Sequence, residues 1–284
     1  MTLSRSAGAA PVPENSPAPS LHSRINSRQP HTARIWNYWL GGRDHYEVDR
    51  AAGDHIRELH PGISEYARAD RLFLGRAVRH LVTECGIRQF LDIGTGLPTA
   101  DNTHEVAQRL APDTRVVYVD NDPLVMVHAR ALLTSAPEGC TDHVDEDLRN
   151  VDAIIEQAGR TLDFTRPVAL MLLGVVIFLG DDEDPHGVVR RLVDALPPGS
   201  HLALSHTITG PALSDVDAAV RYWNAHGTPR LTQRRIEEVA RFFDGLDLLE
   251  PGVVSCSHWR PEGSPAGQDE PAEVAMYCGV ARKP

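Results

Sequence analysis

Short apolar runs alternate with helical segments after Gly86, and this alternation constrains the fold more than any other feature of the sequence. Amphipathic stretches of helical length separate the apolar runs, which cover residues 89–93, 115–119, 143–144 (weakly), 168–173 and 201–205. Strands that alternate with helices form a parallel sheet covered on both faces. The pattern therefore predicts an α/β fold built on a mostly parallel sheet.

The rhythm changes after residue 205. Two further helices are expected at 213–224 and 232–243, followed by two strand-like runs, 246–257 and 273–281, that no helix separates. Neighbouring strands without an intervening helix pair antiparallel most simply. The sheet is therefore expected to end in an antiparallel C-terminal hairpin.

Three regions are predicted along the chain. Residues 1–30 are rich in proline, serine and alanine with few large apolar side chains, which is typical of a disordered leader. Residues 31–86 are expected to form an N-terminal helical cap, with breaks at Gly41–Gly42 and Pro61–Gly62. Residues 87–284 then form the main domain.

Two apolar stripes are expected within the helical cap. The first consists of Ile35, Tyr38 and Trp39. The second lies on a longer helix that Gly86 terminates, and consists of Leu72, Leu74, Val78, Leu81 and Val82.

The charge balance of the chain narrows the range of partners. Its 39 acidic and 28 basic residues give a net charge of -11, which disfavours adhesion to nucleic acid or anionic lipid. No signal-peptide pattern or membrane-length apolar stretch occurs, so a cytoplasmic protein is predicted. The four cysteines lack metal-binding or redox spacing, so we expect no metal and reduced, mostly buried thiols.

A glycine pair follows the first predicted strand, in Phe90-Leu91-Asp92-Ile93-Gly94-Thr95-Gly96. Ligands of open parallel sheets bind outside the carboxyl ends of the strands, where the strand order reverses. Glycines there permit a sharp turn and let a ligand approach the main chain. The pair indicates a ligand but does not identify it.

Two details favour S-adenosylmethionine over a dinucleotide. Thr99 stands where a dinucleotide site commonly has a third glycine or alanine. Asp92 would repel a pyrophosphate but attract the ammonium and sulfonium charges of S-adenosylmethionine. The alternative for Asp92 is that it only accepts hydrogen bonds from loop amides.

Acidic residues also follow the second and third predicted strands. Asp120 can accept both ribose hydroxyls of an adenosine cofactor. The alternative is a helix N-cap, although Asn121 or Asp122 is better placed for that. Asp147 can accept from the adenine amino group while the Leu148 amide contacts the ring, and the alternative is a solvated acidic loop.

Taken together, these strings resemble the actinobacterial S-adenosyl methyltransferase family, formerly known as a domain of unknown function. The resemblance runs from about Ala33 to the C-terminus and rests chiefly on Asn37–Asp44, Leu91–Thr99, Asn102–Ala107 and Val117–Pro123. It implies the Rossmann-like class I methyltransferase fold, S-adenosyl-L-methionine as cofactor, and cofactor contacts at Asp92, Gly94, Gly96, Asp120 and Asp147.

The resemblance also implies that residues around Tyr38 to Arg43 fold over the cofactor as a lid. Gly41–Gly42 permits close backbone approach, and Tyr38 or Arg43 can contact the methionine part; the alternative is an ordinary helix stop with a solvated arginine. Asn102 and Glu105 fit a capping box first and a cofactor role second. The predicted cofactor-binding set is Tyr38, Gly42, Arg43, Asp92, Gly94, Thr95, Gly96, Asp120, Asn121, Asp147 and Leu148.

No general base is evident. The family often has Leu-His-Phe after the fourth strand, where this chain has Val176-Ile177-Phe178. The sulfonium is already an activated donor, so alignment of the acceptor is the main requirement. His206 is the best-placed catalytic candidate, and His45, Tyr46 and Tyr222 are candidates for the acceptor side.

Three functions are compatible with the sequence. The favoured one is methyl transfer to a small-molecule acceptor, because Leu172-Leu173-Gly174-Val175 replaces the Asn-Pro-Pro-Tyr type of signature used on planar nitrogens. The second is a non-catalytic S-adenosylmethionine-binding or regulatory protein. The third is a nucleotide-dependent oxidoreductase, which Asp92 and Thr99 oppose.

Overall fold

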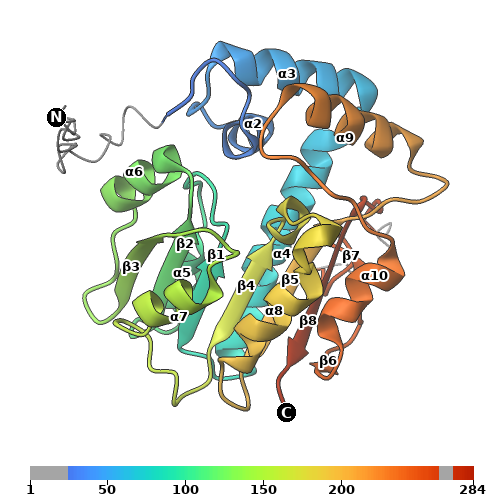
Figure 1. Ribbon diagram of the computed structural model, residues 1–284. Coiled ribbons are helices and arrows are strands. Elements are labelled where there is room, and N and C mark those ends of the chain that lie inside the picture. Colours follow the sequence, from blue (N-terminus) through green and yellow to red (C-terminus); the bar gives the residue numbers. More distant parts are fainter. Residues whose placement is uncertain (1–24, 262–270) are drawn as a thin grey trace, which may run out of the picture.

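The computed structural model describes residues 25–261 and 271–284. Most of the predicted leader at 1–30 lies outside the described residues. Within them, the chain forms one mixed sheet with helices on both faces and a further layer of helices over one edge (Figure 1).

Five parallel strands form the main part of the sheet, in the order β3-β2-β1-β4-β5. They are β1 (Gln89–Ile93), β2 (Arg115–Asp120), β3 (Cys140–Asp145), β4 (Ala169–Leu173) and β5 (His201–Thr207). The strand β1 pairs with both β2 and β4, so the strand order reverses beside it. The predicted mostly parallel sheet is confirmed, and the glycine loop after β1 lies at the reversal point.

The C-terminal strands are antiparallel, as predicted. Strand β8 (Met276–Arg282) pairs antiparallel with β5, and both β6 (Asp247–Leu248) and β7 (Val254–Ser255) pair antiparallel with β8. The expected continuous strand at 246–257 is wrong, because Pro251 and the left-handed Gly252 (φ +90°) interrupt it.

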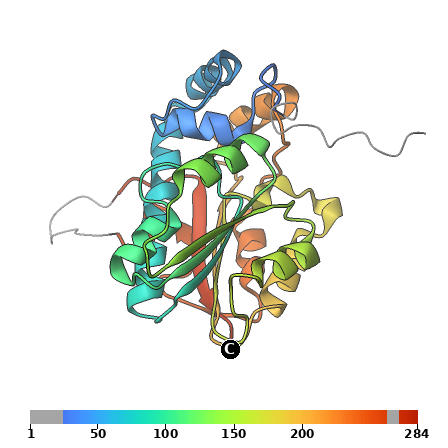
Figure 2. The ribbon, with the colours of Figure 1, turned by 90° about the vertical axis from the view of Figure 1, so that its left-hand side faces the viewer.

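Two groups of helices cover the sheet, and Figure 2 shows them on its opposite sides. The first group contains α4 (Ile63–Thr83) and α5 (Thr103–Leu110). The second contains α7 (Val151–Ala158), α8 (Pro185–Asp194) and the short α10 (Ile236–Ala240). Beside β3, α6 (Pro123–Leu132) begins with a proline at its first turn, where the missing N–H costs nothing. The helix predicted at 232–243 is shorter than expected. It consists of α10 and a 3-10 turn that follows it, Arg241–Phe243.

Three helices lie beyond the carboxyl ends of the parallel strands (Figure 1). They are α2 (Thr32–Trp39), α3 (Glu47–Leu59) and α9 (Ser214–His226), and α3 packs against both of the others. A buried ion pair fastens α2 to α3, because Arg34 Nε donates to Asp49 Oδ2 at 2.8 Å. These helices roof the edge of the sheet where the predicted ligand binds.

The stripe predicted for α4 needs one correction. Its buried face includes Tyr66, Ala69, Phe73, Ala77 and Leu81, which recur every three or four residues and face the sheet. Leu72 falls on the opposite face and is 62% exposed.

All four cysteines are unpaired, two of them buried and two half-buried. In the described part of the chain, no helix combines the length and apolarity needed to cross a membrane.

Candidate cofactor site

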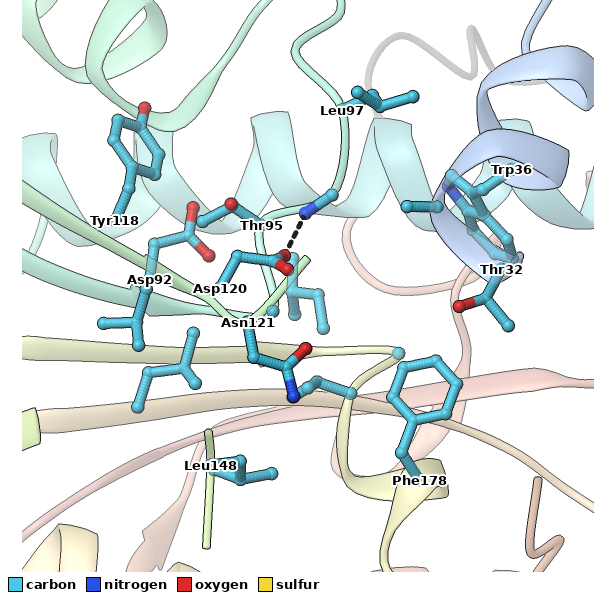
Figure 3. Close-up of a pocket in the computed structure, with 18 of the residues that line it drawn as sticks. Thr32, Trp36, Asp92, Thr95, Leu97, Tyr118, Asp120, Asn121, Leu148 and Phe178 are labelled. Carbon is cyan, nitrogen blue, oxygen red and sulfur yellow. Dashed lines mark hydrogen bonds between the residues drawn. The ribbon is translucent and has the colours of Figure 1, made fainter. Parts of the chain in front are cut away.

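A cavity opens at the carboxyl edge of the sheet where the strand order reverses, and we call it the glycine-loop cavity (Figure 3). Its walls come from α2, α4 and the loops after β1 to β4. The sequence-predicted residues that line it are Asp92, Gly94, Thr95, Gly96, Asp120, Asn121, Asp147 and Leu148. The fold thus brings these eight residues to one cavity.

The glycine loop has a conformation that side chains would oppose. Gly94 has a φ of +78°, and a Cβ there would lie 2.4 Å from Cγ2 of Val175. Gly96 has a φ of +64°, and no atom lies within 4 Å of the corresponding Cβ position. Gly94 is therefore required by packing as well as conformation, whereas Gly96 leaves open space beside the backbone.

Asp92 is a buried carboxylate in the wall of this cavity, with 5% of its surface exposed. Burial raises its pKa to about 6, an effect opposed by the hydrogen bond from Thr103 and the charge of Arg71 and reinforced by the charge of Asp120. Thr103 Oγ1 donates to Asp92 Oδ2 at 2.6 Å. A cation bound beside this carboxylate would stabilise its ionised form.

Asp120 lies beside Asp92 and contacts the glycine loop (Figure 3). Its Oδ2 accepts the Gly96 N–H at 3.0 Å and its Oδ1 accepts the Asp122 N–H at 2.9 Å. Each carboxylate oxygen retains a further lone pair for a ligand donor. Burial raises the pKa of Asp120 to about 6 despite these two amide hydrogen bonds. The N-cap of α6 is Asp122, whose Oδ1 accepts the Leu124 N–H, so Asp120 is not needed for that task.

Asp147 and Asn121 lie together in the loops after β3 and β2. Asn121 Nδ2 donates to Asp147 Oδ2 at 2.8 Å, and Arg149 donates to Oδ1 through its backbone N–H and its guanidinium. Burial alone would raise the pKa of Asp147, but the hydrogen bonds and charge of Arg149 hold it below its usual value. The Leu148 N–H has no hydrogen-bond partner in the described chain, so a ligand acceptor can take it.

The lid residues predicted to contact the cofactor do not line the cavity, and Tyr38 lies on the face of α2 that points away from it. Residues Ala33, Trp36, Asn37 and Leu40 line it, and this spacing of three and four residues defines one face of α2. Tyr38 belongs to the other face, where its hydroxyl donates to Asp54 Oδ1 at 2.6 Å.

Gly42 and Arg43 also lie outside the cavity lining. Gly42 packs on the side chain of Asn37, where a Cβ would come within 2.3 Å of Oδ1, and Arg43 is exposed. Gly42 thus acts on the cavity only through Asn37. Neither Tyr38 nor Arg43 contacts the cavity directly in this geometry.

His206 is placed against the predicted catalytic role. It is completely buried in β5 and is not among the residues that line the glycine-loop cavity. Its Nδ1 donates to the Thr207 carbonyl at 2.8 Å, so its Nε2 is the acceptor for the Arg234 guanidinium at 2.9 Å. Burial lowers the pKa of His206 to about 3. The ring is therefore neutral and both nitrogens are occupied, which leaves no lone pair for an acceptor proton.

The candidates for the acceptor side also lie elsewhere. His45 packs edge-on against Tyr38, and Tyr222 stacks between His55 and His226. Tyr46 is exposed at the start of α3.

Several cavity residues were not found from the sequence. Arg71 of α4 lines the cavity, donates to the Ala100 carbonyl at 2.8 Å, and acts electrostatically on Asp92. Asp70 and Trp36 line it as well. The sequence does show that Arg71 follows the acidic residue Asp70 on a predicted helix. Spacing alone could not show that this helix face is buried and meets the glycine loop.

The fold and the site define the class of protein as a Rossmann-like methyltransferase. A magnesium protoporphyrin IX methyltransferase from Synechocystis shares the fold at 12% identity, with a TM-score of 0.50 over 88% of this chain and 93% of that chain. No curated protein matches the chain.

The family model described as S-adenosyl methyltransferase matches residues 19–284. The chain is 44% identical to a DUF574 family protein of known structure from Streptomyces avermitilis, with a TM-score of 0.85 over 91% of this chain and 99% of that chain. It is 39% identical to a candidate methyltransferase from Thermobifida fusca, with a TM-score of 0.82 over 93% and 97% of the two chains. The chain belongs to the S-adenosyl methyltransferase family, so it is an S-adenosylmethionine-dependent methyltransferase, and the family resemblance seen in the sequence is confirmed.

Proposed function

We propose that the chain binds S-adenosylmethionine in the glycine-loop cavity and transfers its methyl group to a small, uncharged acceptor. The observation that carries this proposal is the pair of carboxylates, Asp92 and Asp120, that flank one glycine loop and have raised pKa values. A cationic ligand relieves this unfavourable burial of charge, whereas a pyrophosphate would aggravate it.

The cavity suggests an orientation for the cofactor. Asp120 would accept the ribose hydroxyls, and the Leu148 N–H would meet the adenine ring. Asp92 and Arg71, on the other side of the glycine loop, would meet the amino and carboxylate groups of the methionine part. The sulfur would then face Gly174 and the side chains that follow β4.

The residues of the chain contribute to transfer chiefly by alignment and by excluding water. The bound cofactor supplies an activated methyl group, so the acceptor must be held in line with the carbon–sulfur bond. We propose that α2 acts as the lid, with Trp36 and Leu40 covering the cavity and Gly42 supporting Asn37 from behind. The ion pair from Arg34 to Asp49 would keep this lid in register with α3.

A transfer assay tests the proposal. Purified protein is incubated with S-adenosylmethionine labelled in the methyl group and with a small-molecule fraction of cell extract, and labelled products are separated by chromatography. We expect label in a compound of low molecular mass, and an Asp120→Ala variant should lose it. Binding of the cofactor without transfer to any fraction would instead favour a regulatory role.

A further inference from the structure

A second cavity of about 100 Å³ adjoins the first, and we call it the aromatic cavity. Residues Thr32, Trp36, Gly174 and Phe178 line both cavities. These shared residues border both cavities beside the end of β4, so we infer a passage there, where the methyl group lies in the orientation proposed above. The aromatic cavity is therefore the space on the acceptor side of the transfer.

Apolar and aromatic side chains make up most of its walls. The large ones come from α2, α3, α4, α9 and the segment after β4, and no Asp, Glu, Lys or Arg is among the lining residues. The aromatic residues of the lining are Trp36, Trp39, Tyr66, Phe178 and Trp223. A charged acceptor would lose its hydration here without gaining a counter-charge.

Most polar atoms around the aromatic cavity already have partners. Trp223 Nε1 donates to the Pro229 carbonyl at 2.7 Å, and Trp39 Nε1 donates to the Gly53 carbonyl at 3.3 Å. The hydroxyl of Tyr66 lies 2.5 Å from Thr207 Oγ1, so these two hydroxyls bond to each other. This hydrogen bond occupies one of their two O–H donors.

His60 is different, because one of its ring nitrogens is free. Its Nδ1 lies 2.6 Å from Asp215 Oδ2, while Nε2 has no hydrogen-bond partner among the residues described. Burial would raise the pKa of Asp215, but the hydrogen bond and charge of His60 hold it below its usual value. Asp215 therefore stays ionised and accepts a hydrogen bond from Nδ1–H, so Nε2 is the ring atom that remains for a ligand.

The contacts of His60 place it within the aromatic cavity. Its ring meets Tyr66 edge-on at 6.3 Å, and Tyr66 in turn meets Trp36 at 5.8 Å. The side chain of His60 is 14% exposed, against 45% for Asp215. The histidine thus supplies a ring nitrogen to a wall whose other side-chain polar groups are mainly the hydroxyls of Thr32, Tyr66 and Thr207, and its carboxylate partner is more exposed to solvent.

We propose that the methyl acceptor is an uncharged, ring-containing molecule with a hydroxyl group, and that this hydroxyl forms a hydrogen bond with His60 Nε2. The inference rests on the proposed function for the identity of its ligand as methyl acceptor, but not for the binding itself. Apolar cavities of roughly 150 Å³ hold a benzene ring, so the aromatic cavity and its passage suit one six-membered ring. The hydroxyl supplies a polar contact that the cavity can satisfy.

Ligand-observed fluorine NMR tests this with three probes that share a fluorinated benzene ring: 4-fluorophenol, fluorobenzene and 4-fluorobenzoate. Dissociation constants are measured on the full chain with and without saturating S-adenosylhomocysteine. We expect 4-fluorophenol to bind about threefold to tenfold more tightly than fluorobenzene, the range of one net hydrogen bond. We expect 4-fluorobenzoate to bind more weakly than both.

His60→Phe keeps an aromatic ring at this position and removes both ring nitrogens. We expect this variant to bind 4-fluorophenol and fluorobenzene equally, while its affinity for S-adenosylhomocysteine stays within twofold of the parent. His226→Phe is the matched control, since His226 is exposed on α9 and lines neither cavity, and it should change nothing.

The outcomes separate the two proposals. Equal binding of the phenol and fluorobenzene by the parent protein, tighter binding of the benzoate, absence of phenol binding, or an unaltered preference in His60→Phe would each overturn the acceptor proposal. Failure of S-adenosylhomocysteine to bind would overturn the cofactor assignment alone. In that case the probes are compared on the unliganded protein, where the same preference for 4-fluorophenol is expected.

Discussion

The affinity for S-adenosylhomocysteine should rise with pH between 5 and 7, because two carboxyl groups of the cavity must ionise to bind it. Asp92 and Asp120 each have a pKa of about 6, raised chiefly by burial. Asp92 faces the cationic amino group in the proposed orientation, and Asp120 accepts the two ribose hydroxyls. Protonation of either group removes its favourable contacts.

The size of the effect follows from these pKa values. A carboxyl of pKa about 6 is about 90% ionised at pH 7 and about 10% ionised at pH 5. Because only the ionised fraction is competent to bind, each group weakens the apparent affinity about tenfold over this range. The charge of Asp120 raises the pKa of Asp92, so the two titrations are coupled. Together they give a change of up to about a hundredfold, which Asp92→Asn should reduce to about tenfold.

Isothermal titration calorimetry at pH 5, 6 and 7 measures this directly, with parent and Asp92→Asn proteins compared. Thr103→Val is a useful control, because it removes the hydrogen bond to Asp92 but keeps the carboxylate and should keep the steep pH dependence. An affinity independent of pH in the parent, or an equally steep dependence in Asp92→Asn, would refute the reasoning.

Three further predictions concern stability and are checked by chemical denaturation of the unliganded protein, and a fourth concerns the affinity for S-adenosylhomocysteine. Since burial raises the pKa of Asp92 from 3.8 to about 6, the folded state binds more protons than the unfolded chain between these values and loses stability as pH rises through them; Asp92→Asn should therefore raise the unfolding free energy at pH 7 by about 3 kcal/mol. Gly94→Ala should destabilise more than Gly96→Ala, because only the former creates a 2.4 Å contact, and equal effects would contradict this. Arg234→Ala should cost about 3 kcal/mol or more, because its buried guanidinium bonds the Leu179 carbonyl, His206 and Asp181. His206→Asn should leave the affinity for S-adenosylhomocysteine within twofold, and a large loss would restore His206 to the site.

The sheet and the glycine loop were predictable because local patterns specify them. Buried strands such as β4 consist of continuous apolar residues, and the loop after β1 has glycines where φ is positive. Strand β3 gave only a weak signal, since it is an edge strand that pairs with β2 alone and has mostly polar, half-buried residues. The weak run predicted at 143–144 is therefore only part of the strand Cys140–Asp145.

Errors at the site arose from contacts between segments distant in sequence. The sequence predicts cofactor contacts from the segment Tyr38 to Arg43, because the helical phase of α2 relative to the cavity cannot be inferred from α2 alone; the cavity meets the face of Trp36 instead. His206 looked accessible at the end of a strand, yet Arg234, 28 residues away, covers it. His60 and Asp215 are separated by 155 residues, so only the folded chain brings them together.

A crystal structure with S-adenosylhomocysteine tests the central claim most directly. The account predicts both ribose hydroxyls within about 2.5–3.2 Å of the Asp120 carboxylate, the adenine ring against Leu148, and the sulfur facing the passage between Trp36 and Phe178. Adenosine bound away from Asp120, or a sulfur directed away from the aromatic cavity, would contradict it.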